Sequence, residues 1–146
     1  MTNETAFSLA NGLVLLQWLL MMVAPHWRVT QWLVRNPLIP ALMACLYAYY
    51  LFSSTGGQFD FMQFATLKGV MTLFQQGGER VVLAGWIHYL TFDLVAGMWI
   101  LRDGQARGIA HGWLVPCLLL CYVLGPTGML VYAAIRVGSR RKLPQE

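Results

Sequence analysis

The chain has 146 residues, enough for one domain. Hydrophobic residues make up 58% and charged residues 11% of the sequence, and the mean hydropathy is +0.55, whereas a soluble domain has about 25% charged residues. The net charge of +4 does not indicate a nucleic-acid partner, because the cations gather after the last apolar run, as in a membrane-surface anchor. The composition therefore predicts an integral membrane protein whose surroundings are lipid.

Four apolar runs predict membrane-spanning helices, since the hydrocarbon core requires about 20 apolar residues per helix. We expect these spans at about 6–24, 37–52, 81–101 and 109–135, followed by a basic C-terminal tail at 137–146. The second run is short, and the fourth is interrupted by a proline and by the sequence GPTG.

The segment between the second and third runs reads FDFMQFATLKGVMTLFQQGGER. Its apolar residues follow helical spacing, and Asp60 and Lys68 make a spanning position unfavourable. The predicted fold class is an all-α, four-helix bundle in the membrane, with an interfacial amphipathic helix between spans 2 and 3.

Four spans would place both termini on the same side of the membrane. That side would carry Lys68, Arg80, Arg136, Arg140, Arg141 and Lys142. The opposite side would carry Arg28, Arg35, Arg102 and Arg107. The small excess of positive residues favours cytoplasmic termini.

The third run, GWIHYLTFDLVAGMWI, contains an aspartate near its centre. Gly85, Tyr89, Asp93 and Gly97 follow one another at intervals of four and form one stripe of the helix, which we expect to face a neighbouring helix. His88 lies about 140° around the helix from Asp93, so the two side chains do not share a face.

Counting residues from the loop after this helix predicts which side chains lie at the same depth. Asp93 is level with Gln17 on the first run, and either that glutamine or a tyrosine is its expected neighbour. His88 is level with Asn11, Tyr49 or Tyr50, and Tyr122, and His111 lies at the rim. The sequence thus predicts two polar levels in an apolar bundle.

A carboxyl group in hydrocarbon, without a cation beside it, is expected to be neutral, so Asp93 would donate a proton or hold a ligand hydroxyl. Three structural alternatives stay open. Asp93 would fix helix register through a hydrogen bond, His88 would pack between helices, and His111 would anchor the interface. No metal-ligand spacing and no cofactor motif is present, and the sequence does not determine an oligomeric state.

The sequence GWIHYLTFDLVAGMWILRDG, followed by HGWLVPCLLLCYVLGPTGMLVYAAIR, resembles the plant neoxanthin-synthase family, known from an abscisic-acid-deficient mutant, and its bacterial relatives. The similarity covers roughly residues 25–136. The residues that carry it are Trp86, His88, Asp93, His111, Gly125, Pro126, Gly128, Tyr132 and Arg136. The chain departs from the family in two respects. It has no plastid transit peptide, which suggests a bacterial inner-membrane protein, and it lacks an arginine that the family commonly carries near Gly97.

The resemblance implies a four-helix membrane protein that acts on a carotenoid or another polyene lipid as an isomerase. Such chemistry requires an acid and a base, for which Asp93, His88 and His111 are the candidates. The expected substrate-binding residues are Trp86, Tyr89, Tyr122, Gln17 and Tyr50. The alternative function is a carotenoid- or lipid-binding membrane subunit without catalysis.

Overall fold

The computed structural model describes residues 2–54 and 60–139. Every regular element in these residues is helical, and none of them forms a strand, so the predicted all-α class is confirmed. The elements are α1 (Asn3–Val23), α2 (Arg28–Arg35), α3 (Leu38–Ser54), the 3₁₀ helix η1 (Phe61–Ala65), α4 (Leu67–Gln76), α5 (Gly78–Ala106), α6 (His111–Leu124) and α7 (Pro126–Gly138).

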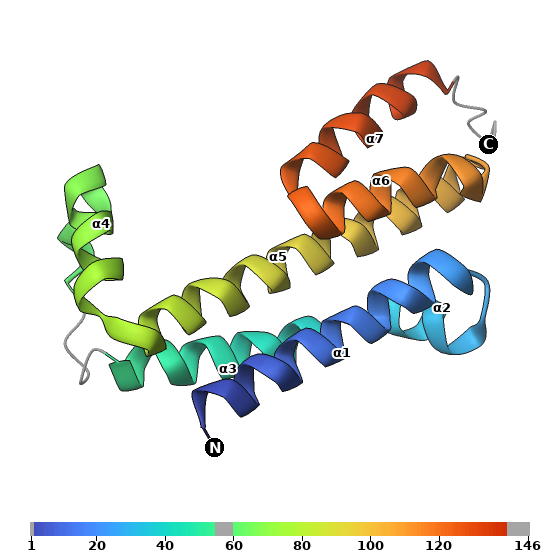
Figure 1. Cartoon of the computed structure of the whole chain (residues 1–146). Helices are drawn as coiled ribbons and strands as arrows, with labels where there is room; N and C mark the ends of the chain where they lie inside the picture. Colours follow the sequence, from blue (N-terminus) through green and yellow to red (C-terminus); the bar gives the residue numbers. More distant parts are fainter. Residues whose placement is uncertain (1, 55–59, 140–146) are drawn as a thin grey trace.

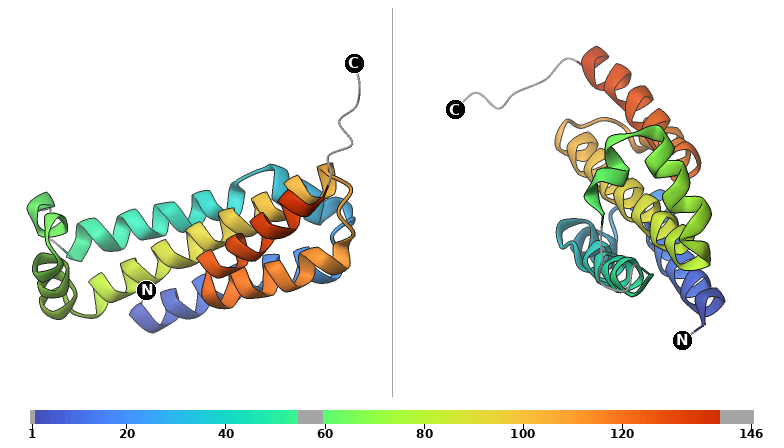
Figure 2. Two further views of the ribbon diagram at one scale, coloured as in Figure 1. Left: turned by 90° about the horizontal axis from the view of Figure 1, so that it is seen from above. Right: turned by 90° about the vertical axis from the view of Figure 1, so that its left-hand side faces the viewer.

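Helix α5 is the central element of the fold. Its 29 residues extend about 43 Å at 1.5 Å per residue, and the other long helices pack against different parts of it (Figure 1). Figure 2 shows α1, α3 and α5 running side by side. The buried side of α1 recurs every three or four residues, as expected for one face of a helix, at Ala6, Ala10, Val14, Trp18 and Met21.

The predicted glycine stripe of α5 does meet neighbouring elements, but through aromatic rings. A Cβ atom at Gly97 would lie 2.3 Å from the Trp18 ring of α1, so the absence of a side chain makes room for this indole. A Cβ atom at Gly85 would lie 2.9 Å from the Phe74 ring of α4. Small residues here admit large side chains rather than a second backbone.

Helix α2 follows α1 in the chain and packs against α1 and α5. Thr30 and Val34 form its buried side, and the Gln31 amide donates hydrogen bonds to the Pro25 carbonyl at 2.6 Å and to Gln105 Oε1 at 2.9 Å. The α1–α3 connection is thereby attached to the last turn of α5.

The expected amphipathic segment forms η1 and α4. Helix α4 buries none of its residues and projects from the start of α5 (Figure 1). Its exposed apolar side chains include Leu67 and Met71, and Met62 of η1 is also exposed. The helical prediction is confirmed, and an interfacial position stays a prediction.

The fourth expected span, 109–135, is not one helix. Gly125 ends α6 with φ +49° and ψ −103°, a backbone conformation that side chains with a Cβ rarely adopt. Pro126 then begins α7 at a position where its missing N–H costs no hydrogen bond. Helix α7 turns back along α6 and forms a hairpin with it (Figures 1 and 2).

The hairpin places the start of α1 and the end of α7 differently from the prediction. Asn3 at the start of α1 donates a hydrogen bond of 3.0 Å to Glu79 at the start of α5, whereas Arg136 near the end of α7 bonds to Asp103 near the end of α5. The start of α1 and the end of α7 therefore lie at opposite ends of the central helix, an arrangement that four continuous spans would not give. The side of the membrane on which each terminus lies stays a prediction.

The predicted four-helix membrane bundle is not confirmed. Among the described residues, α1 and α5 are long and apolar enough to cross a membrane, and α3 and α6 are shorter apolar helices. The continuous helices agree with the first three expected runs, 6–24, 37–52 and 81–101, to within a few residues. The fourth differs because a glycine turn divides it.

Candidate functional site

Asp93 lies half-buried on α5, where the α6–α7 turn passes over it. A Cβ atom on Gly125 would lie 2.7 Å from Asp93 Oδ1, so only glycine lets the turn approach the carboxyl this closely. The Cys121 thiol of α6 donates a weak hydrogen bond of 3.7 Å to the Asp93 backbone carbonyl. The acid therefore faces the helical hairpin.

One oxygen of the Asp93 carboxyl group, Oδ2, is buried without a hydrogen-bond partner in the described structure. The Tyr89 side chain, one turn earlier on α5, interacts with the same carboxyl, and its hydroxyl donates to the Val123 carbonyl at 3.3 Å. A buried carboxyl oxygen without a partner is costly, and a bound ligand group would relieve this cost.

An open cavity of about 460 Å³ adjoins Asp93, and we call it the Asp93 cavity. Its walls are apolar except for the carboxyl group. It is lined by Phe92, Asp93, Val95, Ala96 and Trp99 of α5, and by Gly125, Pro126 and Met129 at the hairpin turn. Small-molecule sites commonly combine apolar walls with a few polar groups in this way.

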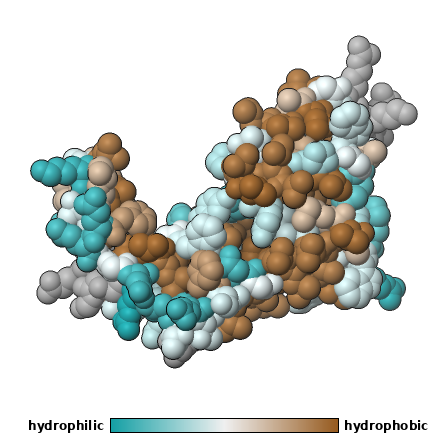
Figure 3. Space-filling model, viewed as in Figure 1, coloured by the Kyte–Doolittle hydropathy of each residue, from teal (hydrophilic) through white to brown (hydrophobic). Residues whose placement is uncertain are grey.

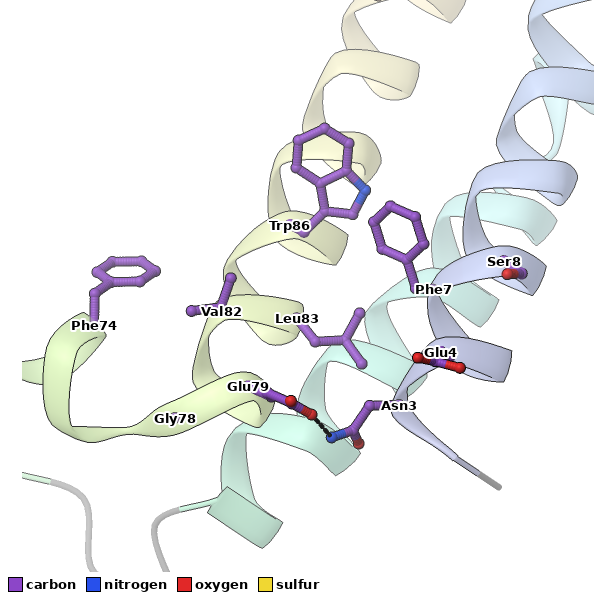
Figure 4. Close-up of a pocket in the computed structure, with 10 residues that line it drawn as sticks. All are labelled: Asn3, Glu4, Phe7, Ser8, Phe74, Gly78, Glu79, Val82, Leu83 and Trp86. Carbon is purple, nitrogen blue, oxygen red and sulfur yellow. Dashed lines mark hydrogen bonds between the residues drawn. The ribbon is translucent and has the colours of Figure 1, made fainter.

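A second cavity, of about 790 Å³, lies between the first turns of α1, the end of α4 and the start of α5, and we call it the Trp86 cavity (Figure 4). The aromatic side chains of Phe7, Phe74 and Trp86 line it. Its polar end is the hydrogen-bonded pair of Asn3 and Glu79. Its composition suits an amphiphilic molecule with one polar end.

A row of aromatic rings runs from the Trp86 cavity towards Asp93. The rings of Phe7 and Trp86 stack with centroids 6.0 Å apart, and the Trp86 and Tyr89 centroids are 5.5 Å apart. Trp86, Tyr89 and Asp93 fall within about 60° of one another around α5. The Trp86 Nε1 donor bonds to Asn11 at 3.3 Å, which ties this row to α1.

The structure does not bring the two predicted histidines to Asp93. The exposed His88 ring faces α3, with centroids 5.3 Å from Tyr47 and 4.6 Å from Phe92. His111 begins α6, about 21 Å along that helix from the hairpin turn, and its Nε2 donates to the Met22 carbonyl at 2.9 Å. Neither histidine lines the Asp93 cavity.

The remaining predicted ligand-binding residues are dispersed. Gln17 is buried, and neither of its polar side-chain atoms has a hydrogen-bond partner within the described chain, so it does not bond to Asp93. Tyr122 packs edge-on against Trp18 with ring centroids 5.6 Å apart, and the buried Tyr50 contacts the Tyr49 ring. Among the tyrosines, Tyr89 is adjacent to the acid.

Sequence reasoning missed a charged cluster at the end of α5, which we call the Asp103 cluster. Asp103 Oδ2 accepts hydrogen bonds from Arg107 Nε at 2.7 Å, from Arg136 Nε at 2.8 Å and from the Tyr132 hydroxyl. The Arg136 guanidinium also lies 5.7 Å from the centre of the Trp99 ring, a wall of the Asp93 cavity. The signal was available as two pairs spaced four residues apart, Asp103 with Arg107 and Tyr132 with Arg136.

Metal ligands do not converge in the part of the chain that the structure describes. No group of three or more histidine, cysteine, aspartate and glutamate side chains lies close enough there to hold an ion.

Fold and site define an all-helical, largely apolar protein with a single carboxyl group in an apolar cavity. Residues 5–132 match the family described as ABA DEFICIENT 4-like. Because the match covers most of the chain, the protein belongs to this family, and the resemblance seen in the motifs is confirmed.

A curated relative is the chloroplastic protein ABA DEFICIENT 4 of Arabidopsis thaliana. It is 28% identical over 127 residues, which cover 82% of this chain. The match covers 57% of the relative, so the chain spans little more than half of that protein's length. No solved structure matches the chain.

Proposed function

We propose that the protein is a multi-pass membrane protein that binds a carotenoid-like polyene in the Asp93 cavity and isomerises it by proton transfer. Membrane residence is supported by the apolar composition, by the length of α1 and α5 and by the hydrophobic residues that cover much of the surface in Figure 3. Family membership supports the substrate class. The observation that carries the proposal is the unpartnered Asp93 Oδ2 at an apolar cavity.

The proposed isomerisation requires one proton donor and one proton acceptor. Opening an epoxide to a hydroxyl and forming a new carbon–carbon double bond adds a proton to oxygen and removes one from carbon, so the substrate's composition is unchanged. Asp93 enters protonated and donates its proton to the oxygen, and the resulting carboxylate accepts the proton from carbon. Such proton transfer contributes about 10²–10⁴-fold to a rate, and Tyr89 positions the carboxyl.

The catalytic roles predicted for His88 and His111 stay predictions. The geometry does not support them, because neither histidine lines the Asp93 cavity. This same observation favours the second candidate function, a polyene-binding membrane subunit without catalysis. In that case Asp93 holds a ligand hydroxyl, and Phe92 and Trp99 contact the apolar chain.

Asp93→Asn distinguishes the two functions, because an amide keeps the size of the side chain but does not transfer a proton. We would produce the wild type, Asp93→Asn and the control Asp60→Asn, which lies outside both cavities, in a carotenoid-producing host, and analyse the pigment by absorption and mass spectrometry. An enzyme loses at least about 10²-fold of its turnover in Asp93→Asn while it stays folded and pigmented, and Asp60→Asn retains activity.

The binding function gives a different result. Pigment then copurifies unchanged with the wild type and is reduced or shifted in its absorption in Asp93→Asn. A folded wild-type protein that binds no supplied carotenoid and converts none contradicts both functions.

A further inference from the structure

We propose that the protein crosses the membrane three times, through α1, α3 and α5, that α6 and α7 form a re-entrant hairpin, and that the end of the molecule with α2 and the Asp103 cluster contacts the anionic headgroups of the cytoplasmic leaflet. The inference rests on the membrane residence proposed above and is independent of the ligand and of any reaction. It places the ends of α1 and α7 on opposite sides of the membrane.

The hairpin is the first support. Helices α6 and α7 have 14 and 13 residues, so each extends about 20 Å, well short of the hydrocarbon core of about 30 Å. Helix α3, with 17 residues, extends about 26 Å and spans with a small local thinning of the bilayer. A Cβ atom on Gly128 of α7 would lie 2.4 Å from the Cys117 carbonyl of α6, so the two backbones are in close contact. Neither helix crosses the membrane, and together they enter and leave on one side.

The turn of this hairpin satisfies the condition for irregular backbone at membrane depth. Non-helical backbone within the hydrocarbon is tolerated where protein covers it. Gly125 is buried against the Asp93 carboxyl, and its N–H bonds to the Cys121 carbonyl at 2.9 Å. The glycine of the turn is therefore covered by α5 and α6, whereas Pro126 and Thr127 beside it are exposed.

The charges are distributed very unevenly between the two ends of α5, and this is the second support. We call the end that contains the Asp103 cluster the arginine end. Its cations are Arg28, Arg35, Arg102, Arg107 and Arg136, and its acid is Asp103. The opposite end carries the cations Lys68 and Arg80 and the acids Glu4, Asp60 and Glu79. The comparison covers the described residues, and Asp93 lies between the two ends.

This asymmetry orients the protein. Arginine and lysine in short loops are retained on the cytoplasmic side, and the negative surface potential of an anionic leaflet attracts cations near it. Four continuous spans would have moved Arg136 to the other side and nearly cancelled the difference. The hairpin instead places Arg136 at the arginine end, which keeps the difference in charge. We therefore infer that the arginine end is cytoplasmic.

The exposed side chains at the arginine end also suit a membrane surface. Arg28, Arg35 and Arg102 are exposed and form no ion pair among the described residues. Trp27, Trp32 and Trp113 are more than half exposed, and tryptophan is enriched at membrane interfaces. Indoles and guanidinium groups together match the headgroup region of an anionic leaflet.

Three positions in the full chain test which side of the membrane each end of the molecule occupies. In a bacterial host, Gln76→Cys on α4 and Ala106→Cys at the end of α5 are treated with a membrane-impermeant maleimide before and after permeabilisation, with the wild type as the background from its native cysteines. A fluorescent protein that matures only in the cytoplasm is fused after Glu146. We expect Gln76→Cys to react in intact cells, Ala106→Cys to react only after permeabilisation, and the fusion to fluoresce.

Each other result overturns a defined part of the inference. A dark but stably inserted fusion, with Ala106→Cys protected, shows that α7 ends on the outer side and that there is no hairpin. Labelling of Ala106→Cys in intact cells shows that the orientation is reversed. A wild-type chain released from membranes by alkaline carbonate contradicts the membrane residence in the proposed function instead.

The contribution of the arginines is tested by replacing Arg28, Arg35 and Arg102 together with glutamine, in the Gln76→Cys background. We expect a mixed population, in which Gln76→Cys is labelled in only a fraction of the molecules before permeabilisation. The control replaces the two cations of the opposite end, Lys68 and Arg80, and retains full labelling. An unchanged orientation in the triple variant shows that these arginines do not orient the protein.

Discussion

Asp93 and Asp103 lie on the same helix in opposite environments. Asp93 has an oxygen without a hydrogen-bond partner in the described structure, beside an apolar cavity. Asp103 accepts three hydrogen bonds on a single oxygen, two of them from arginines. The first environment suits proton transfer or ligand binding, and the second holds an ionised carboxyl that joins α5 to α7.

We expect Asp103→Asn to destabilise the protein by about 2 kcal/mol, because hydrogen bonds to charged groups are worth about 1.5–3 kcal/mol each and this side chain is 20% exposed. The amide also leaves Arg107 and Arg136 next to each other without an anion. Thermal unfolding in detergent measures the loss. Asp60→Asn is the control, because asparagine also caps a helix. Equal melting temperatures of the two variants would show that the cluster does not hold α7.

At the scale of elements, the α6–α7 hairpin decides the shape of the site. It supplies Gly125, Pro126 and Met129 to the Asp93 cavity, and its close packing depends on Gly128, which lies against the backbone of α6. The Asp103 cluster holds the other end of α7. The hairpin is thus attached at both ends, and its turn forms one wall of the cavity.

Gly128→Ala tests the close approach of the two helices. An added Cβ would lie 2.3 Å from the Cys121 backbone nitrogen, so α7 must shift, and we expect a loss of about 1–3 kcal/mol, as in overpacked cores. Gly112→Ala is the matched control, because its Cβ would meet no atom within 4 Å. Alanine there should be neutral or stabilising. A Gly128→Ala protein as stable as the Gly112→Ala protein would contradict the observed packing.

At the scale of the whole molecule, α1, α3 and α6 pack around α5 while many apolar side chains are exposed. Leu9 and Leu16 on α1 are both more than half exposed and lie seven residues apart on one face. In water such a face would be a liability. In a bilayer the same face of α1 would contact lipid. Substitutions on this face therefore test whether the protein resides in water or in a membrane.

We expect the double variant Leu9→Lys with Leu16→Lys to impair membrane insertion, since a lysine at the centre of a spanning helix costs about 2.5–3.5 kcal/mol. The fraction of protein resistant to alkaline carbonate measures insertion. Leu9→Ala with Leu16→Ala is the control and should insert normally. A lysine variant that inserts and folds like the alanine variant, or becomes more soluble without loss of fold, would show that this face does not contact lipid.

Local sequence patterns determined the helical class, the first three apolar helices and the amphipathic segment before α5, because helix periodicity and apolar length act over neighbouring residues. They also indicated that Asp93 is unusual, since an acid is costly in an apolar helix. The resemblance carried by the motifs led to the correct family, although it did not reveal which of the motif residues meet in space.

Only the tertiary structure decided the direction of the chain after Gly125, and with it the partners of Asp103 and the end of α5 beside which α7 ends. A glycine–proline sequence permits either a kink or a reversal, and long-range packing selects between them. The same reason explains why His88 and His111 lie away from Asp93 although all three share one motif. Spacing along a helix determines the direction of a side chain, whereas its neighbours depend on how distant helices pack.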